Sequence, residues 1–202
     1  LQLTGGTTVA ATVYLAHQAG IEVMATGGIG GVHRDRRDIS SDLPTLARTP
    51  TLVICSGAKA ILDLPATREW LETYGIPVVG YQTDELPGFY TAHTGLRTDA
   101  TVHDVDALIA LWQAHRMGGT AMLVVQPPPA EYALPRAEMD ALLEQALREC
   151  VDARITGSAT TPWLLKRLAE LSDGRTLQVN LALLESNARL AGQIAKRLHA
   201  SP

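Results

Sequence analysis

Among the three lysines of the chain, Lys59 stands out by its position. It follows the apolar run Leu52–Cys55 through the small residues 56–58, whereas Lys166 and Lys196 fall on the solvated sides of expected helices. Partial burial disfavours the charged ammonium, so such an amine can act as a nucleophile or form a Schiff base. A lysine whose stem covers the first turn of a helix, with its charge in water, is the alternative. The local sequence leaves both interpretations open.

A second group with chemical potential is the polar stretch 38–42, which reads DISSD. Its two carboxylates and two hydroxyls suit a hard divalent cation, or a sugar phosphate that brings its own metal. Asp38 or Ser40 could equally cap a short helix expected from Leu43, because Asp and Ser are favoured at that position. Both interpretations remain open.

The third feature is the glycine-rich segment 26–31, TGGIGG. It lacks the third glycine of a dinucleotide fingerprint and no helical pattern follows it, so nicotinamide binding is disfavoured. Four glycines in six residues indicate that the backbone closely approaches a ligand or another strand. His33, just beyond, could donate to a phosphate or serve as a loop histidine.

The elements that must position these residues alternate along the chain. Strands are expected at 21–25, 52–55, 76–81 and 121–125. Helices are expected at 8–18, 43–48, from 58 to 62, 67–74, 105–117, 136–151, 163–171 and 179–199. Such alternation is typical of an α/β/α layered domain. Because open α/β sheets bind ligands where strands end, the site is expected beyond the first two strands.

Bulk properties narrow the class of protein. The 202 residues fit one domain, and a net charge of −4 with scattered arginines disfavours binding to nucleic acid. No apolar run is long enough to span a bilayer. Cys55 and Cys150 offer neither a disulfide framework nor zinc-ligand spacing, and the expected setting is the cytoplasm.

Taken together, the motifs resemble the pseudouridine-5′-phosphate glycosidase family, also called the indigoidine synthase A-like family. The resemblance extends over essentially the whole chain. The matching segments are GGTTVAAT at 5–12, TGGIGGVHR at 26–34, DISSDL at 38–43, LARTP at 46–50, CSGAK at 55–59, PVVGYQTDELPGFY at 77–90, TPWLL at 161–165, and the last helix with Asn180 and Asn187.

This resemblance implies a three-layer α/β/α fold with a mixed sheet, and a single catalytic domain over residues 1–202. It also implies a lysine-dependent lyase that cleaves or forms the C–C glycosidic bond between ribose 5-phosphate and a base, as in pseudouridine 5′-phosphate. Lys59 is then the nucleophile that attacks C1′ of the ring-opened sugar. A cytoplasmic homotrimer is expected.

The other site residues follow from the same resemblance. Asp38 is expected to hold a divalent metal, usually manganese. The substrate-binding residues are expected to be Val9, Thr26, His33, Ser40, Ser41, Asp42 and Asn180, with the polar residues 40–42 at the sugar phosphate and Asn180 at the base.

Several departures from the family pattern bear on the substrate. The family carries an upstream segment with a glutamate proton donor and a second lysine, so the chain is expected to lack an N-terminal part of the family domain. The insert between His33 and Asp38 is short, Gln126 replaces the asparagine of N-P-x-P, and segment 157–162 departs from G-K-x-x-T-P. Because the sugar-phosphate motifs are kept, two alternatives stand beside the main interpretation. One is a C-glycosynthase that attaches ribose 5-phosphate to an aromatic natural product, and the other is an inactive sugar-phosphate-binding homologue.

Overall fold

Short parallel strands form the centre of the fold in this computed structural model, which describes residues 5–34 and 38–200. In the described chain they lie in the order β1-β2-β5-β3-β4. The strands are β1 (Val23–Ala25), β2 (Leu52–Cys55), β3 (Val78–Tyr81), β4 (Ala100–Val102) and β5 (Met122–Val125). The α/β class is confirmed, but every pairing among these strands is parallel, so the expected mixed sheet is corrected to a parallel one.

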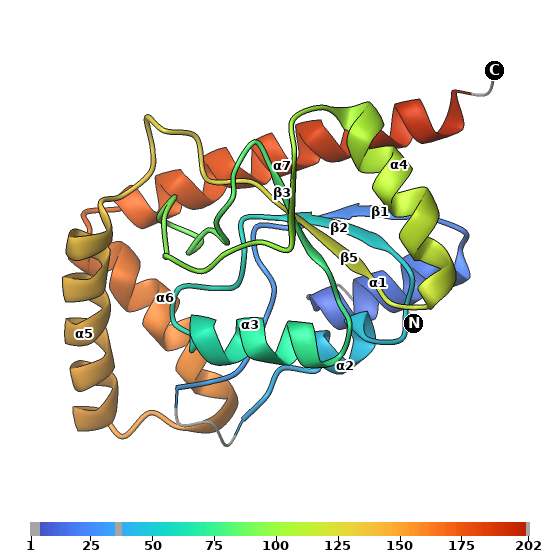
Figure 1. Cartoon of the computed structure of the whole chain (residues 1–202). Coiled ribbons are helices and arrows are strands. Elements are labelled where there is room, and N and C mark those ends of the chain that lie inside the picture. The colour runs from blue at the N-terminus through green and yellow to red at the C-terminus, as the bar shows by residue number, and fades with distance from the viewer. Residues whose placement is uncertain (1–4, 35–37, 201–202) are drawn as a thin grey trace.

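Helices cover both faces of this sheet (Figure 1). They are α1 (Val9–Gln18), α2 (Asp42–Leu46), α3 (Leu64–Thr73), α4 (Val105–His115), α5 (Arg136–Asp152), α6 (Thr160–Leu171) and α7 (Arg175–His199). Helices α4 and α7 lie over one face, α1 to α3 lie over the other, and α5 and α6 stand to one side. This is the three-layer arrangement expected from the alternation of elements.

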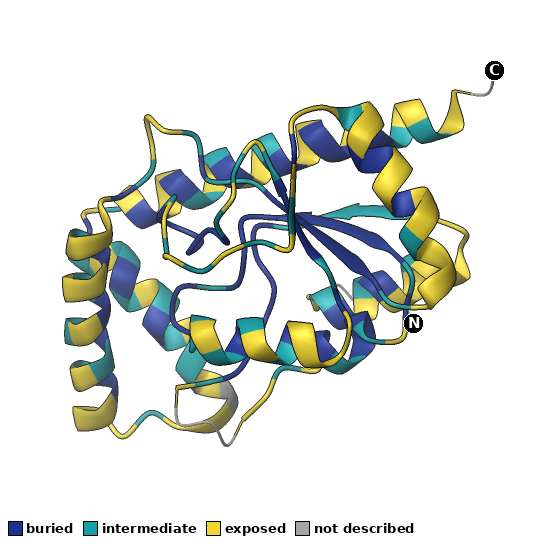
Figure 2. Cartoon of the chain, viewed as in Figure 1, coloured by how far each residue is buried: buried dark blue, intermediate teal, exposed yellow. Residues whose placement is uncertain are grey.

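Strand β2 shows why two helical layers are needed. Its four residues are all buried, and alternate side chains enter opposite cores. Leu52 and Ile54 belong to the core that includes Trp112 of α4, whereas Val53 and Cys55 belong to the core that includes Leu71 of α3. Figure 2 shows the buried central strands β2 and β5 between the half-exposed helices.

Three local predictions were wrong. Residues 58–62 form a bridge and turns rather than the start of a helix, because Lys59 and its neighbours continue to pair with the segment after β1. The spacing of Leu181, Leu184, Leu190 and Ile194 predicts that these side chains of α7 face inward, yet Leu181 is 61% exposed and Leu184 is also exposed. The buried face of α7 instead carries Leu183, Asn187 and Leu190.

Two further observations complete the fold. Strand β4 was not expected, because it is only three residues long and lies at the sheet edge, where β3 is the neighbour. Among the described residues, none of the helices combines the length and the apolar character that crossing a bilayer requires.

Candidate active site

The site begins where β1 and β2 end. We call residues 26–31 the glycine turn and residues 56–59 the lysine turn. The two segments continue the parallel pairing of their strands through backbone hydrogen bonds. Ile29 N–H donates to the carbonyl of Gly57 at 3.0 Å, and the carbonyl of Ile29 accepts from Lys59 N–H at 3.1 Å. The backbone of Lys59 is therefore fixed beside the glycine turn.

The glycines of this turn allow close packing against other parts of the chain. A Cβ atom on Gly30 would stand 2.1 Å from Ser40 Oγ, and one on Gly28 would stand 2.6 Å from the ring of Phe89. Gly57 in the lysine turn has φ +83°, which favours glycine. The close approach expected from the sequence is therefore at least partly to protein rather than to a ligand.

Asp42 joins three elements at one point. Its Oδ1 accepts from Ala10 N–H in α1 at 2.8 Å, and its Oδ2 accepts from Gly30 N–H at 2.7 Å. The residue is only 5% exposed, so both carboxylate oxygens are held by backbone donors in a buried setting. Asp42 thereby places the first turn of α1 and the glycine turn around the same space.

That space is a cavity of about 520 Å³. Seven of the nine residues expected at the site line it, namely Val9, Thr26, His33, Ser40, Ser41, Asp42 and Lys59. Among its lining residues, all of them in the described chain, Lys59 is the one lysine or arginine. The remaining wall combines threonine hydroxyls with apolar side chains: Thr7, Thr8, Thr12 and Thr161, and Met24, Ala25, Leu62 and Leu184.

Asp38 and Asn180 do not line the cavity. The Asp38 carboxylate is 65% exposed and stands 3.6 Å from Nε2 of His33, which does line it. Asn180 lies against the glycine turn, where a Cβ on Gly27 would be 3.2 Å from its Oδ1. Both residues are thus next to the cavity, through His33 and Gly27 respectively.

The donor set around Asp38 limits how a metal could be held. No group of three or more His, Cys, Asp or Glu residues in the described chain could hold a metal ion. Ions such as Mg²⁺ commonly bind through one or two carboxylates and take their other ligands from water and substrate phosphate. The exposed Asp38 carboxylate fits that kind of site and does not fit a closed protein cage.

Cys55, the last residue of β2, is the other potential nucleophile near the site. Burial raises the pKa of its thiol to about 12. Because the thiolate is the reactive form, this cysteine is inert at neutral pH. Lys59 therefore remains the candidate nucleophile at the end of β2.

Sequence reasoning missed two residues that support the site. Phe89 has a left-handed backbone with φ +66°; its N–H donates to the carbonyl of Ser56 at 3.0 Å, and its ring packs on Gly28. A single polar residue in the middle of a helix is expected at the surface, but Asn187 is fully buried. Its spacing from Leu183 and Leu190 on α7 is the signal that could have placed it inward.

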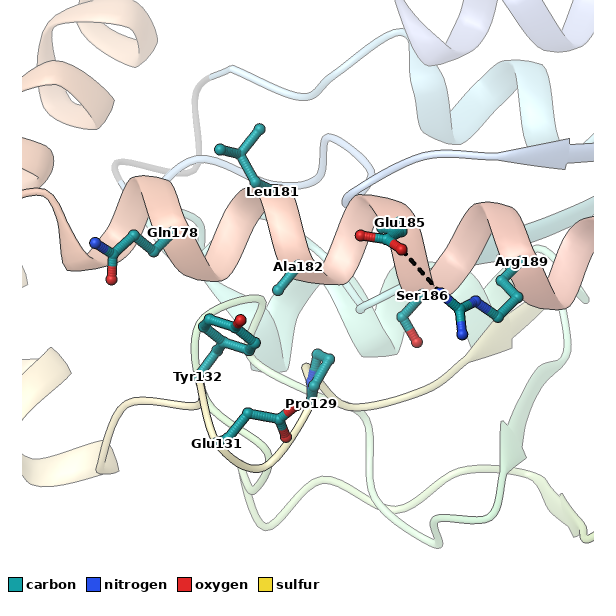
Figure 3. A pocket seen from close by; sticks show the side chains of 9 residues that line it. All are labelled: Pro129, Glu131, Tyr132, Gln178, Leu181, Ala182, Glu185, Ser186 and Arg189. Atoms are coloured by element: carbon teal, nitrogen blue, oxygen red, sulfur yellow. Dashed lines mark hydrogen bonds and ion pairs between the residues drawn. The ribbon is translucent and has the colours of Figure 1, made fainter.

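A separate groove lies on the outer side of α7, against residues 129–132 (Figure 3). Leu181, Glu185, Ser186 and Arg189 face it, and Glu185 and Arg189 form an ion pair at 2.8 Å. None of its lining residues lines the cavity of Lys59. The two spaces are therefore distinct.

The fold and the site together define a parallel α/β protein with a single cationic amine in a hydroxyl-lined cavity at the carboxyl ends of its strands. A sequence model of the family described as "Indigoidine synthase A like protein" matches residues 1–197, and the chain belongs to this family.

Its relatives include two proteins named pseudouridine-5′-phosphate glycosidase. The one from Gemmatimonas aurantiaca is 55% identical over 197 residues, which cover 96% of this chain and 64% of the relative. The one from Herpetosiphon aurantiacus is 50% identical over 202 residues, 98% of this chain and 67% of the relative. The chain thus spans about two thirds of the length of the curated relatives it matches.

Two solved structures are similar over nearly the whole chain. The first is an indigoidine synthase A-like protein from Thermotoga maritima, with TM-score 0.88 and 41% identity over 95% of this chain and 64% of that one. The second is the prealnumycin C-glycosynthase AlnA in complex with ribulose 5-phosphate, with TM-score 0.90 and 39% identity over 96% of this chain and 66% of that one. The fold class is confirmed by both.

Proposed function

We propose that this protein is a C-glycosidase, a lyase that cleaves or forms the C–C bond between ribose 5-phosphate and a base through a covalent adduct on Lys59. The observation that carries the proposal is the position of Lys59, whose backbone is fixed beside the glycine turn and which lines a hydroxyl-rich cavity. Relatives that are 50% and 55% identical and named pseudouridine-5′-phosphate glycosidase support this substrate.

The chemistry explains why an amine is required. In cleavage, Nζ of Lys59 displaces the ring oxygen at C1′, and that oxygen takes a proton. The nitrogen lone pair then forms a C1′=N iminium as the bond from C1′ to the base breaks. The electron pair of that bond stays on the base carbon, which takes a proton. Water adds to the iminium and releases the sugar phosphate with the free amine. A carbon leaving group is poor, so this electron sink is needed.

The remaining residues have proposed roles around that amine. Ser40, Ser41 and His33 offer donors to the sugar phosphate, and Asp42 holds the backbone that surrounds it. Val9 and Thr26, which line the cavity, would contact the substrate, and Asn180, which lies beside Gly27, would contact the base. Manganese or another divalent cation held by Asp38 and water would neutralise charge on the phosphate.

A second candidate is the reverse reaction with another acceptor. The AlnA C-glycosynthase has the same fold over 96% of this chain, and Met24 and Leu184 give the cavity an apolar side that suits an aromatic acceptor. Synthesis and cleavage pass through the same iminium, so Lys59 has the same role in both. An inactive sugar-phosphate-binding homologue is the third alternative.

Product analysis tests these alternatives. Protein expressed from its complete gene would be incubated with Mn²⁺ and pseudouridine 5′-phosphate, or with ribose 5-phosphate and either uracil or an aromatic acceptor panel. Chromatography with mass detection should show uracil release in the first mixture. Lys59→Ala should abolish it, and Lys166→Ala, which alters an exposed lysine, should not. Product only with an aromatic acceptor would favour the synthase, and no product in any mixture would favour the binding homologue.

We also propose that the protein is a cytoplasmic homotrimer, as the family resemblance implies. Exposed apolar residues on α1 and α7, including Tyr14, Leu15, Leu177 and Leu181, offer surface that subunit contacts could cover. Cys55 and Cys150 are buried free thiols, which fits a reducing compartment. Light scattering coupled to gel filtration would test the trimer.

A further inference from the structure

Asn187 lies at the centre of α7 with no exposed surface, and its carboxamide is bonded at both ends. Its Nδ2 donates to the carbonyl of Thr26 at 2.8 Å and to Ser56 Oγ at 3.3 Å. Its Oδ1 accepts from Nε2 of Gln126 at 2.9 Å. A backbone carbonyl only accepts hydrogen bonds, so the contact with Thr26 fixes which end of the amide points to the sheet.

These bonds join three neighbouring strands just beyond their carboxyl ends. Thr26 follows β1 and opens the glycine turn, Ser56 follows β2 and opens the lysine turn, and Gln126 follows β5. The residue that bonds all of them comes from α7, which contributes Leu183 to the core that includes α3 and Leu190 to the core that includes α4. Asn187 therefore bonds both of the turns that bound the cavity, in addition to the backbone bonds between them.

The orientation of Gln126 is fixed from a second side. Its Nε2 also donates to Ser186 Oγ at 3.1 Å, and Ser186 faces the outer groove in Figure 3. The network therefore runs from the groove through α7 to the carbonyl of Thr26, a residue that lines the cavity. Replacing a member leaves buried polar groups without partners, so the network favours a single arrangement of the turns.

The neighbours of Asn187 on the buried face of α7, Leu183 and Leu190, are apolar. Apolar residues in such a position stabilise the helix packing without specifying how two loops are spaced. The polar side chain at this point bonds the two segments that carry Thr26 and Lys59.

We propose that Asn187 is a positioning residue for Lys59. It does not touch the substrate; it holds the glycine turn and the lysine turn in the spacing that brings the Lys59 amine to the sugar carbon. This inference rests on the proposed function of Lys59. Small displacements of reacting groups can reduce rates by about 10²-fold, so loss of this spacing should affect the chemical step more than substrate binding.

The first experiment measures adduct formation per folded protein. Wild type, Asn187→Ala and Asn187→Asp would be mixed with ribose 5-phosphate, and the adduct would be trapped by borohydride over time at several sugar concentrations. Asn187→Asp keeps the size of the side chain but removes both donors. Gln193→Ala, an exposed amide on the same helix, is the matched control. We expect both Asn187 variants to lose about tenfold or more in maximal rate, with the half-saturating sugar concentration little changed.

The second experiment separates positioning from general destabilisation and needs no activity. Hydrogen exchange of the same proteins should rise in peptides covering 26–33 and 56–62, while β3 and the ends of α7 keep wild-type exchange. The proposal would be overturned if the variants and the wild type exchanged equally in those two peptides, or if exchange rose uniformly throughout the protein. If Asn187→Ala does not fold, Ser56→Ala removes one acceptor only and should show the same pattern more weakly.

The two proposals fail in different ways. A wild type that forms no adduct refutes the proposed function, and hydrogen exchange then decides alone whether Asn187 positions the two turns. A wild type that forms the adduct, together with Asn187 variants that form it at the wild-type rate, refutes the positioning role and leaves the function of Lys59 intact.

Discussion

Replacing Asp42 with asparagine should strongly lower the free energy of unfolding. The carboxylate accepts one hydrogen bond from Ala10 N–H and one from Gly30 N–H, at 2.8 and 2.7 Å, and the side chain is buried. A carboxamide in its place cannot serve both donors, because its amide nitrogen would face one of the two N–H groups. Hydrogen bonds to a charged group contribute about 1.5–3 kcal/mol each, so loss of one predicts a destabilisation of about 2–3 kcal/mol.

Urea unfolding followed by circular dichroism would measure this loss. With a slope of about 2 kcal/mol per molar urea, the midpoint should fall by about 1–1.5 M. Asp38→Asn is the matched control, since that carboxylate is largely exposed, and it should shift the midpoint by about 0.25 M or less. An Asp42→Asn midpoint as close to wild type as that of the control would refute the view that this residue joins α1 to the glycine turn.

Three other changes test separate parts of the structure. Gly30→Ala should lower the free energy of unfolding by about 2–3 kcal/mol in thermal or urea unfolding, because the new Cβ would stand 2.1 Å from a serine oxygen. The control Gly192→Ala, whose Cβ on α7 meets no atom within 4 Å, should raise the free energy of unfolding by about 0.5–1 kcal/mol. Glu85→Gln should destabilise the protein at pH 7, because backbone donors hold the pKa of this carboxyl below its usual value. The difference in stability between wild type and variant should shrink as the pH falls below about 4.3, the usual pKa of a glutamate, and through the lower pKa of Glu85 in the folded protein. Neither Cys55 nor Cys150 should react with a thiol reagent at pH 8 until urea is added, since burial raises both pKa values.

Each of these has a contradicting result. Equal stability of the two glycine variants would show that the glycine turn does not need close packing. A Glu85→Gln difference that stays constant from pH 7 to pH 3 would show that the carboxylate charge does not contribute. Rapid labelling of the native protein would show that the cysteines are accessible.

The sequence predicted the strands that carry the site because apolar runs and glycine punctuation are local signals. Leu52–Cys55 was placed correctly, and the residues after it were expected to hold the reactive lysine. The gathering of Val9 with Ser40 and Lys59 at one cavity could be expected only from the family resemblance, since it depends on contacts between distant segments. The roles of these residues stay predictions.

Other features depended on tertiary contacts that no local pattern reports. Residues 58–62 form no helix, because the N–H of Lys59 is already bonded to the carbonyl of Ile29 in the glycine turn. Strand β4 has only three residues, so only its pairing with β3 reveals it. Leu181 is exposed and Asn187 is buried, because the helix is oriented by its whole buried face and not by individual apolar residues.

Intact-mass spectrometry after borohydride trapping directly tests whether Lys59 is the nucleophile. Protein from the complete gene would be incubated with ribose 5-phosphate and Mn²⁺, reduced, and compared with Lys59→Ala treated in the same way. We expect the wild type to gain the mass of one reduced sugar phosphate, peptide mapping to locate it on Lys59, and the variant to gain none. An adduct of equal yield in Lys59→Ala, or no adduct in the wild type, would contradict the assignment of Lys59 as the nucleophile.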